Sequence, residues 1–373
     1  MIIGIPKESH HQERRVGLTP AGAYALAQEG YRVLVEDHAG SQCGFSNEDY
    51  RDAGAEIVFR PSEVFQRADL VIKVFPVNLE EAQEIRDGAI LFSFFQMGIA
   101  DRRACKILAD KKVTAVGLDL LQRPDGQHPV LTAMSEIAGV MAPHVAARFL
   151  ESTYGGRGIL LGGIAGLPAA NVVILGAGVV GGTAARAFLG AGAHVIVMDN
   201  NLDRLRRIEN LSYKMISTAI ASPFNIDRYT RFADVLVGAV FIHGQKTPHL
   251  VYESHVKNMK RGALIMDISI DQGGCVETSR PTTHQNPIFE KHGVIHYCVP
   301  NMPAAVARSA SHAFNNVVLP YIARVARERK PEAWRHSEEL QSGTYLYEGC
   351  CTNENIAALF QMNFTELNQL IAQ

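Results

Sequence analysis

Short apolar runs alternate with amphipathic segments along the first 120 residues of the chain. The runs are rich in Val, Ile and Phe, and the segments between them space their apolar residues as helices do. Continuous apolar runs of this length are typical of parallel strands covered on both faces. The pattern predicts βαβ units and a mainly parallel sheet. The expected strands are residues 1–6, 31–37, 55–59, 68–75, 89–95 and 113–120.

A second alternating series follows a long predicted helix. That helix covers residues 135–153, with Ser135 as its N-cap, and a glycine-rich loop or hairpin follows it at 154–171. From about residue 303 the pattern becomes helical. This tail must pack somewhere, and the most economical place is the first domain, which would then be discontinuous. The strands expected in the second series are residues 171–178, 193–200, 233–241, 263–269 and 293–299.

Composition fits two globular domains of ordinary size, because the chain has 373 residues, 47% of them hydrophobic and 20% charged. A net charge of −2 without long charged blocks favours a small-molecule substrate and no nucleic-acid or membrane partner. The first residues do not resemble a signal peptide, and no apolar stretch reaches transmembrane length without polar interruption. Six cysteines without a CxxC pair fit a reducing compartment, so we expect a cytoplasmic protein. The histidines show no metal-binding spacing, so no metal site is expected.

The best defined motif is a glycine-rich turn between a predicted strand and a predicted helix. Gly176, Gly178 and Gly181 form GxGxxG, and Val179 and Val180 open the helix. In this motif the first glycine permits the tight turn, the second lets a pyrophosphate approach the backbone, and the third allows close helix–strand packing. The helix N-terminus supplies N–H donors to the phosphates. The motif predicts a dinucleotide site, although a glycine-rich turn without a nucleotide has the same pattern.

An acidic residue supports the dinucleotide interpretation. Asp199 ends the next strand, where a carboxylate binds the adenosine ribose hydroxyls and repels a 2′-phosphate, so the predicted cofactor is NAD rather than NADP. Arg204 and Arg206 follow closely and temper this preference, and Arg204 is placed in the cofactor site. We therefore expect two Rossmann-like α/β domains with parallel sheets and a cleft between them. Residues 131–302 would bind NAD, and residues 1–130 with 303–373 would form a discontinuous substrate domain.

Four polar features in apolar surroundings are candidates for a substrate site. Lys73 lies within an apolar strand, so its ammonium either extends to solvent or is held in a cleft to meet an anionic or carbonyl-bearing substrate. Arg14 or Arg15 could present a bidentate fork to a carboxylate. The other two features follow predicted strands, at the edge where parallel sheets bind ligands. They are Asp267 and Asp271 with Gly273 and Gly274, and Asn301 between Pro300 and Pro303.

Taken together, these motifs resemble bacterial alanine dehydrogenase. The order and approximate spacing of that family are kept by GIPKE with ERRVGLTP, KV around Lys73, MSEIAG, the glycine motif with Asp199, DISIDQGGC with SRPTTH, and CVPNMPAAV. The wider group also contains the proton-translocating nicotinamide nucleotide transhydrogenase. The resemblance covers nearly the whole chain. It implies NAD-dependent, reversible oxidative deamination of L-alanine to pyruvate and ammonium by a homo-oligomer, a homohexamer in this family.

The resemblance also implies roles for individual residues. Arg15 would pair with the substrate carboxylate. Lys73 would hydrogen-bond the substrate carbonyl oxygen and stabilise negative charge as water or ammonia adds. Asp271 would lie near the amino group and the nicotinamide ribose. The remaining expected neighbours are Met134 and Asn301, for the substrate, and Ser135, for the cofactor.

Two departures from the family pattern concern the pocket. The family keeps an acid/base histidine where this chain has Gln96, a candidate catalytic residue that hydrogen-bonds but does not exchange protons near neutral pH. Asp271, with a pKa raised by burial, or His243 beside the nicotinamide could replace the histidine. Alternatively, Gln96 only packs and His243 lies on a surface loop. In addition, KVFPV replaces the usual KVKEP, which makes the pocket wall more apolar.

Three other functions stay open. The chain could reduce a different 2-oxo acid, imine or amino-acid-derived intermediate, with Gln96 contacting a polar substrate group. It could be an NAD-binding module like the extramembrane transhydrogenase domain, which the DQGGC segment and the absence of a following transmembrane region oppose. It could also be an inactive paralogue, which the presence of Arg15, Lys73 and Asp271 opposes.

Overall fold

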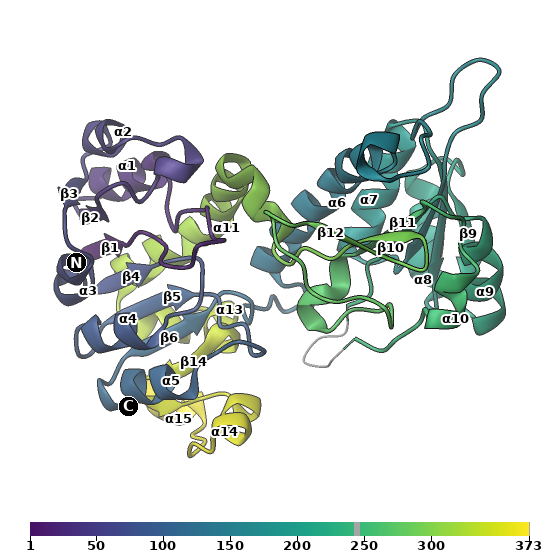
Figure 1. Ribbon diagram of the computed structural model, residues 1–373. Helices are drawn as coiled ribbons and strands as arrows, with labels where there is room; N and C mark the ends of the chain where they lie inside the picture. Colours follow the sequence, from purple (N-terminus) through teal and green to yellow (C-terminus); the bar gives the residue numbers. More distant parts are fainter. Residues whose placement is uncertain (242–246, 373) are drawn as a thin grey trace. The chain divides into compact units, whose positions relative to one another are not determined.

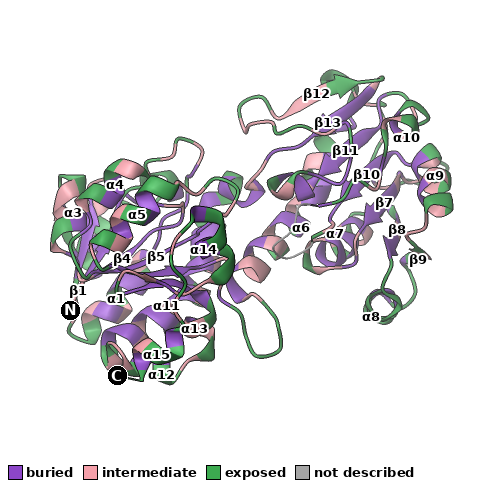
Figure 2. Ribbon diagram, turned by 90° about the horizontal axis from the view of Figure 1, so that it is seen from below, coloured by how far each residue is buried: buried purple, intermediate pink, exposed green. Residues whose placement is uncertain are grey.

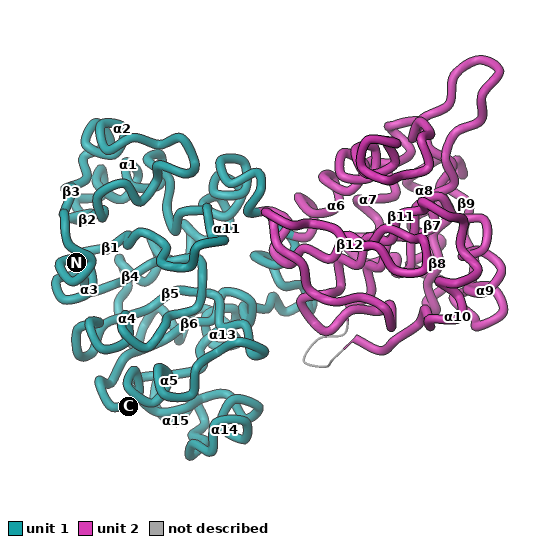
Figure 3. The backbone as a smooth tube through the Cα atoms, in the orientation of Figure 1, with its two compact units in different colours: residues 1–134, 304–373 teal, residues 135–303 magenta. Residues whose placement is uncertain are grey.

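The computed structural model describes residues 1–241 and 247–372, which form two α/β units (Figure 3). Unit 1 contains Met1–Met134 and Ala304–Gln373, and unit 2 contains Ser135–Pro303. In each unit the strands alternate with helices along the chain, and the sheet is mainly parallel. The predicted fold class of two Rossmann-like α/β domains, one of them discontinuous, is confirmed.

The sheet of unit 1 is built from eight strands in the described residues. They are β1 (Ile2–Ile5), β2 (Arg32–Glu36), β3 (Glu56–Val58), β4 (Leu70–Ile72), β5 (Ile90–Ser93), β6 (Thr114–Gly117), β14 (Thr344–Tyr347) and β15 (Cys350–Cys351). Their order is β15-β14-β6-β5-β4-β1-β2-β3, with β1 to β6 parallel and the last two strands antiparallel. The order of connection reverses between β1 and β4. In parallel sheets, ligands bind outside the carboxyl ends of the strands at such a point.

The helices of unit 1 come from both chain segments (Figure 1). They are α1 (Pro20–Gln28), α2 (Asn47–Asp52), α3 (Pro61–Arg67), α4 (Leu79–Glu84), α5 (Arg102–Asp110), α11 (Ala307–Glu328), α12 (Glu332–Arg335), α13 (Glu338–Gly343), α14 (Glu354–Phe360) and α15 (Leu367–Ile371). The sequence pattern predicted a helical tail from about residue 303. The structure differs, because the tail also contains two strands. Residues 344–351 form the hairpin β14–β15, because Glu348 and Gly349 both adopt positive φ, at 48° and 85°, in a tight turn.

The six parallel strands of unit 2 are connected in the same order as those of unit 1. Its strands are β7 (Asn171–Leu175), β8 (His194–Asp199), β9 (Ser217–Ile220), β10 (Val235–Gly238), β11 (Leu264–Asp267), β12 (Ile288–Lys291) and β13 (Val294–Tyr297). The order is β12-β13-β11-β10-β7-β8-β9, and the β12–β13 pair is antiparallel. The order of connection reverses between β7 and β10, so these strands mark the expected ligand edge of unit 2.

The helices of unit 2 pack on its sheet. They are α6 (Pro129–Phe149), which begins in unit 1, α7 (Val179–Gly190), α8 (Leu202–Leu211), α9 (Pro223–Phe232) and α10 (Glu253–Lys257). Short 3-10 turns lie at Ser41–Cys43, Ser152–Tyr154, Ile268–Gln272 and Met302–Val306. The glycine-rich segment before β7 projects from unit 2 (Figure 1), and Ile164 and Leu167 form an isolated antiparallel bridge in it. The predicted loop or hairpin is confirmed there.

Helix α6 differs from the prediction at its start. It begins at Pro129, so Ser135 is an internal helical residue and not the N-cap. Proline is favoured in the first turn of a helix, and no breaker separates it from Ser135. Within the described residues α6 is the one helix with the length and apolar composition of a membrane span, a feature that core helices share. Its residues Ala138, Ala142 and Ala146 belong to the core of unit 2.

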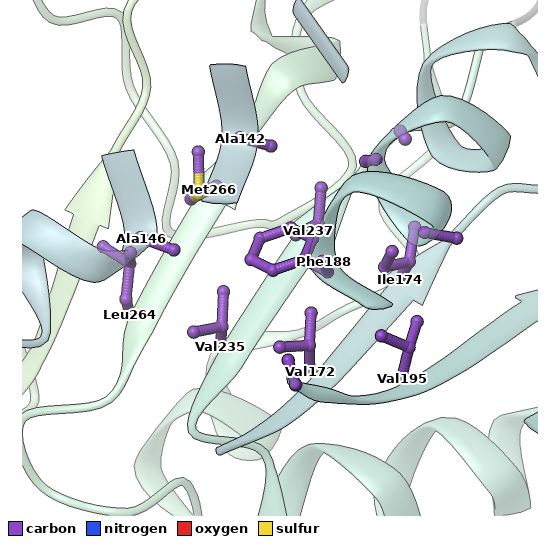
Figure 4. Packing of buried hydrophobic residues seen from close by; sticks show 14 of the residues in the cluster. Ala142, Ala146, Val172, Ile174, Phe188, Val195, Val235, Val237, Leu264 and Met266 are labelled. Carbon is purple, nitrogen blue, oxygen red and sulfur yellow. The ribbon is translucent and has the colours of Figure 1, made fainter. Parts of the chain in front are cut away.

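The core of unit 2 shows how the strand pattern becomes packing. Alternate residues of β7, β10 and β11 point to the same side of the sheet, toward α6 and α7 (Figure 4). Buried residues therefore lie along both the strands and the inner faces of the helices, while exposed residues follow the outer faces (Figure 2). The facing residues include Val172, Ile174, Val235, Val237, Leu264 and Met266 of the strands, Ala142 and Ala146 of α6, and Phe188 of α7.

Candidate functional site

The glycine-rich turn of unit 2 follows β7 and opens α7, as predicted. Gly176 has φ of 103°, and a Cβ there would lie 2.4 Å from the Ala239 carbonyl oxygen. A Cβ on Gly181 would lie 1.8 Å from the Gly176 carbonyl oxygen. Gly178, in contrast, has nothing within 4 Å of its missing Cβ. The fold therefore needs glycine at positions 176 and 181. Gly178 leaves open space at the start of α7, where a phosphate group can approach N–H donors.

Asp199 connects the end of β8 to this turn. Its carboxylate accepts a hydrogen bond from the Ala177 N–H at 2.7 Å and another from the Asn201 N–H at 2.8 Å. The side chain is 6% exposed, and Arg204 Nη1 lies 3.8 Å from it. The structure thus brings together two predicted cofactor residues, Asp199 and Arg204, beside the glycines. Asp199 therefore has a structural role, because its carboxylate holds the turn in place. This role is separate from the predicted binding of a ribose.

The turn after β11 contains the predicted aspartates in different environments. Asp267 is buried and accepts hydrogen bonds from the N–H groups of Cys275 (3.3 Å) and Val276 (3.1 Å), and burial raises its pKa. Asp271 lies in the following 3-10 turn and is exposed. The expectation that Asp271 is a buried carboxyl is therefore wrong for this structure. The chain folds back so that residues 275 and 276 cover Asp267, while Asp271 stays at the surface.

The remaining predicted residues of unit 2 lie on two elements. Asn301 follows β13, is half-buried, and has φ of 55°. Its carbonyl oxygen lies 3.3 Å from His284 Nε2. Ser135 is half-buried within α6. The strand ends that precede Gly176, Asp199, Asp271 and Asn301 belong to parallel strands of one sheet, so these four residues lie at its carboxyl edge. His243, the other proposed proton carrier, lies outside the described residues.

Arg15 of unit 1 is buried and engaged by a neighbour. Its Nε donates to Glu13 Oε1 at 2.7 Å and its Nη2 to Glu13 Oε2 at 2.6 Å. Its Nη1 lies 3.1 Å from the Met134 sulfur, so two predicted substrate residues are in contact. Arg14, the alternative, is exposed. The Arg15 guanidinium is therefore paired with Glu13 and packed against Met134.

Lys73 is fully buried, so it neither extends to solvent nor faces an open cleft in this structure. Its Nζ donates to both oxygens of Glu81, at 2.8 and 2.6 Å, and lies 3.7 Å from Glu8. Glu81 also accepts the Asn78 N–H and so caps α4. The charge of the buried lysine is therefore balanced by carboxylates of its own unit. For Lys73 to reach a substrate oxygen, the bond to Glu81 has to open.

Gln96 follows β5 at the carboxyl edge of unit 1. Its φ is 48°, and its backbone N–H donates to Asp119 Oδ2 at 2.9 Å. The Phe95 N–H donates to the other Asp119 oxygen at 2.6 Å. The side chain is half-buried. Asp119 thus fixes the backbone that presents Gln96, since a left-handed conformation in a non-glycine residue needs such support.

Sequence reasoning missed the carboxylates that hold the site together, namely Glu8, Glu13, Glu81 and Asp119. Glu8 is the most informative of them, because it joins two strands. Its carboxylate accepts the N–H groups of Val74 at 2.5 Å and Phe75 at 3.2 Å, so it fastens the segment after β1 to the end of β4. The available signal was the burial of Lys73, which demands a counter-charge.

Comparisons with known proteins agree over the whole chain. The model for the alanine dehydrogenase/PNT N-terminal domain matches residues 4–138, and that for the C-terminal domain matches residues 142–354. A protein named alanine dehydrogenase 2 from Staphylococcus aureus is 41% identical over 372 residues, covering 100% of both chains.

Solved structures give the same result. An L-alanine dehydrogenase structure superposes with a TM-score of 0.92 at 37% identity, covering 97% of this chain and 99% of that one. A transhydrogenase from Sinorhizobium meliloti shares the fold, with a TM-score of 0.81 at 22% identity and coverage of 95% of this chain and 99% of that one. With both domain models matched and relatives similar from end to end, the chain belongs to the alanine dehydrogenase/PNT family.

Proposed function

We propose that this protein is an NAD-dependent oxidoreductase that catalyses the reversible oxidative deamination of L-alanine to pyruvate and ammonium. The observation that carries the proposal is the similarity to proteins named alanine dehydrogenase over the full length, through both domains. The presence of Arg15 in contact with Met134 supports it, because an arginine fork is suited to the carboxylate that all amino acids and 2-oxo acids share.

The cofactor is a nicotinamide dinucleotide, which we propose to be NAD. The open space at Gly178 fits a pyrophosphate, and the N–H groups of Val179 and Val180 begin α7 beside it. Asp199 would accept ribose hydroxyls and disfavour a 2′-phosphate. When bound, the nicotinamide accepts or returns the hydride. Equal affinity for NADH and NADPH in a fluorescence titration would contradict the choice of NAD.

The substrate site is proposed to lie at the carboxyl edge of unit 1. Arg15 would bind the carboxylate, and Gln96 would hydrogen-bond a polar substrate atom. Lys73 would reach the carbonyl oxygen only after its bond to Glu81 opens. By family resemblance, Asp271 and Asn301 would contact the substrate and Ser135 the cofactor.

A second function is favoured by the state of Lys73. With that lysine engaged by Glu81, and with Phe75 and Gln96 where the family pattern is charged or ionisable, the edge of unit 1 is less polar than the family pattern implies. A related NAD-dependent reductase acting on a different 2-oxo acid, imine or amino-acid-derived substrate fits this observation.

We also propose a homo-oligomer, a hexamer by family resemblance, that is cytoplasmic and has no nucleic-acid or membrane partner.

The test is oxidation of NADH by the purified protein with ammonium and a panel of 2-oxo acids that includes pyruvate. Turnover fastest with pyruvate supports the alanine reaction. Turnover with another 2-oxo acid alone replaces it by the second function. Gain of pyruvate turnover in Gln96→His, from an inactive starting protein, would show that the alanine reaction was lost at this position.

Arg15 and its neighbour offer a matched pair of variants. Arg15→Lys keeps a charge beside Glu13 and loses the planar fork, so KM for the 2-oxo acid rises. Arg14→Lys changes an exposed side chain and leaves KM unchanged. Equal KM values for the two variants would remove Arg15 from the substrate site.

A further inference from the structure

His10 lies at the point of unit 1 where the order of strand connection reverses. It belongs to the segment after β1, and its ring stacks on that of Phe75, after β4, with centroids 4.1 Å apart and planes 13° from parallel. The two N–H bonds from Val74 and Phe75 to Glu8 hold these segments together. Ligands bind outside the carboxyl ends of parallel strands at such a point. His10 is half-buried there, and its neighbour His11 is exposed.

A hydrogen bond to the His10 ring favours one of its two neutral tautomers. Nδ1 accepts from the Gln12 N–H at 3.4 Å. An accepting Nδ1 has no proton, so the neutral ring carries its proton on Nε2. Within residues 1–241 and 247–372, the hydrogen bond of the ring is made through Nδ1 and not through Nε2. The ring thus presents an N–H donor at the carboxyl edge of the sheet.

Burial and the balance of nearby charges favour the neutral form of the His10 ring. Burial lowers its pKa, and the neighbouring His11 and the ammonium of Lys73 lower it further, while the carboxylate of Glu13 raises it. Glu13 is also the partner of Arg15, so His10 lies within electrostatic range of the proposed carboxylate site. A neutral imidazole that donates a hydrogen bond can polarise a carbonyl group without exchanging a proton.

We propose that His10 Nε2–H donates a hydrogen bond to the carbonyl oxygen of the 2-oxo acid, the contact that the buried and engaged Lys73 does not offer. The proposal rests on the proposed function insofar as the substrate is a 2-oxo acid. As ammonia adds, the N–C bond forms, the C=O π bond breaks, and its electron pair moves to the oxygen that His10 faces. A proton then passes from the added nitrogen to that oxygen and gives the carbinolamine, with His10 unchanged.

Variants at two adjacent histidines test the donor. His10→Phe keeps the stack on Phe75 and loses the donor, so kcat with the preferred 2-oxo acid falls about 100- to 1000-fold. His10→Gln has an amide N–H₂ close to the place of Nε2 and retains most of kcat. His11→Phe is the control and leaves kcat unchanged. Wild-type kcat in His10→Phe would overturn the proposal, since the ring would then only pack. Equal losses in His10→Phe and His10→Gln, with loss of one limb of the pH profile, would overturn it in favour of proton exchange.

A binding measurement separates this proposal from the proposed function. In ¹⁵N-histidine-labelled protein, the His10 resonances are those that disappear in His10→Gln. Adding a 2-oxo acid with NADH, without ammonium, shifts the Nε2 resonance if His10 contacts the carbonyl. The acid is the one turned over fastest, or pyruvate if none is turned over. No turnover contradicts the proposed function alone, and an unmoved Nε2 resonance contradicts the donor role of His10 alone.

Discussion

At the scale of single residues, unit 1 is distinguished by buried cations that pair with buried carboxylates. Lys73 is the clearest case, because both Glu81 and Glu8 lie beside its Nζ with no exposed surface on the lysine. Lys73→Met leaves these carboxylates uncompensated, so the free energy of unfolding falls by about 3–5 kcal/mol. The loss grows as the pH rises, since protonation of the carboxyls relieves it at low pH. Urea unfolding at several pH values measures both effects.

The control is an exposed pair. Arg51→Met removes a surface ion pair with Glu48 and changes the unfolding free energy little. A Lys73→Met protein with unchanged stability and no activity would contradict the structural role of the lysine. It would instead place Lys73 on the substrate, as the family resemblance implies.

Glu8 gives the protein a pH-dependent stability. Burial raises its pKa from 4.5 to about 7, although Lys73 and the Val74 N–H act in the opposite direction. A carboxyl with a raised pKa in the folded state contributes stability below its unfolded pKa and loses it as the pH rises through the folded value. Between pH 4.5 and 7 the unmodified protein therefore loses roughly 3 kcal/mol more than Glu8→Gln does. Parallel stability curves for the two proteins would contradict this, and Glu48→Gln is the exposed control.

The sequence locates these residues better than it identifies their partners. Lys73, Gln96 and Asp199 could be placed at strand ends because apolar runs mark the strands. The carboxylates around Lys73 could not be found in this way. Glu8 is 65 residues away and meets the lysine only when β1 and β4 pair. Glu81 is eight residues away, but the apolar pattern does not show that it turns toward the lysine. Likewise, nothing local shows that Asp271 is exposed while Asp267 is buried.

At the scale of elements, the β7–α7 turn separates packing from binding. Gly181→Ala forces a Cβ against the Gly176 carbonyl, so it destabilises unit 2 by about 1–3 kcal/mol. Gly178→Ala has open space and a φ of −73°, so stability stays unchanged while NADH affinity falls. Thermal unfolding and fluorescence titration of both variants measure the two effects. Tight NADH binding by Gly178→Ala would remove the pyrophosphate from this turn.

Elements with strong periodicity were predictable, and those that depend on distant partners were not. The parallel strands β1, β4 and β5 read as apolar runs because both of their faces are covered. The hairpin β14–β15 was missed, because β14 becomes a strand by pairing with β6, more than 200 residues earlier. The one local feature that could have indicated the hairpin is the Glu348-Gly349 turn, which lies between residues that favour strands.

At the scale of the whole molecule, two large hydrophobic clusters of the described residues each belong to a single unit. The cluster around Val172 and Phe188 lies entirely in unit 2, and the cluster around Leu91 and Phe360 lies entirely in unit 1. The latter joins the two chain segments of unit 1, which explains in physical terms why the tail returns to the N-terminal segment: its apolar faces complete that core.

Separate cores predict separate unfolding transitions in calorimetry. NADH at 100 times its Kd stabilises the unit that binds it by about 2.7 kcal/mol, because it binds the folded form only. For a unit of this size that raises the transition temperature by about 5–10 °C. We expect only the unit 2 transition to move, and Gly181→Ala identifies that transition by lowering it. The 2-oxo acid alone raises the other transition. A single transition that both ligands raise equally would mean that the two units unfold together, and that neither ligand can be assigned to one of them by stability.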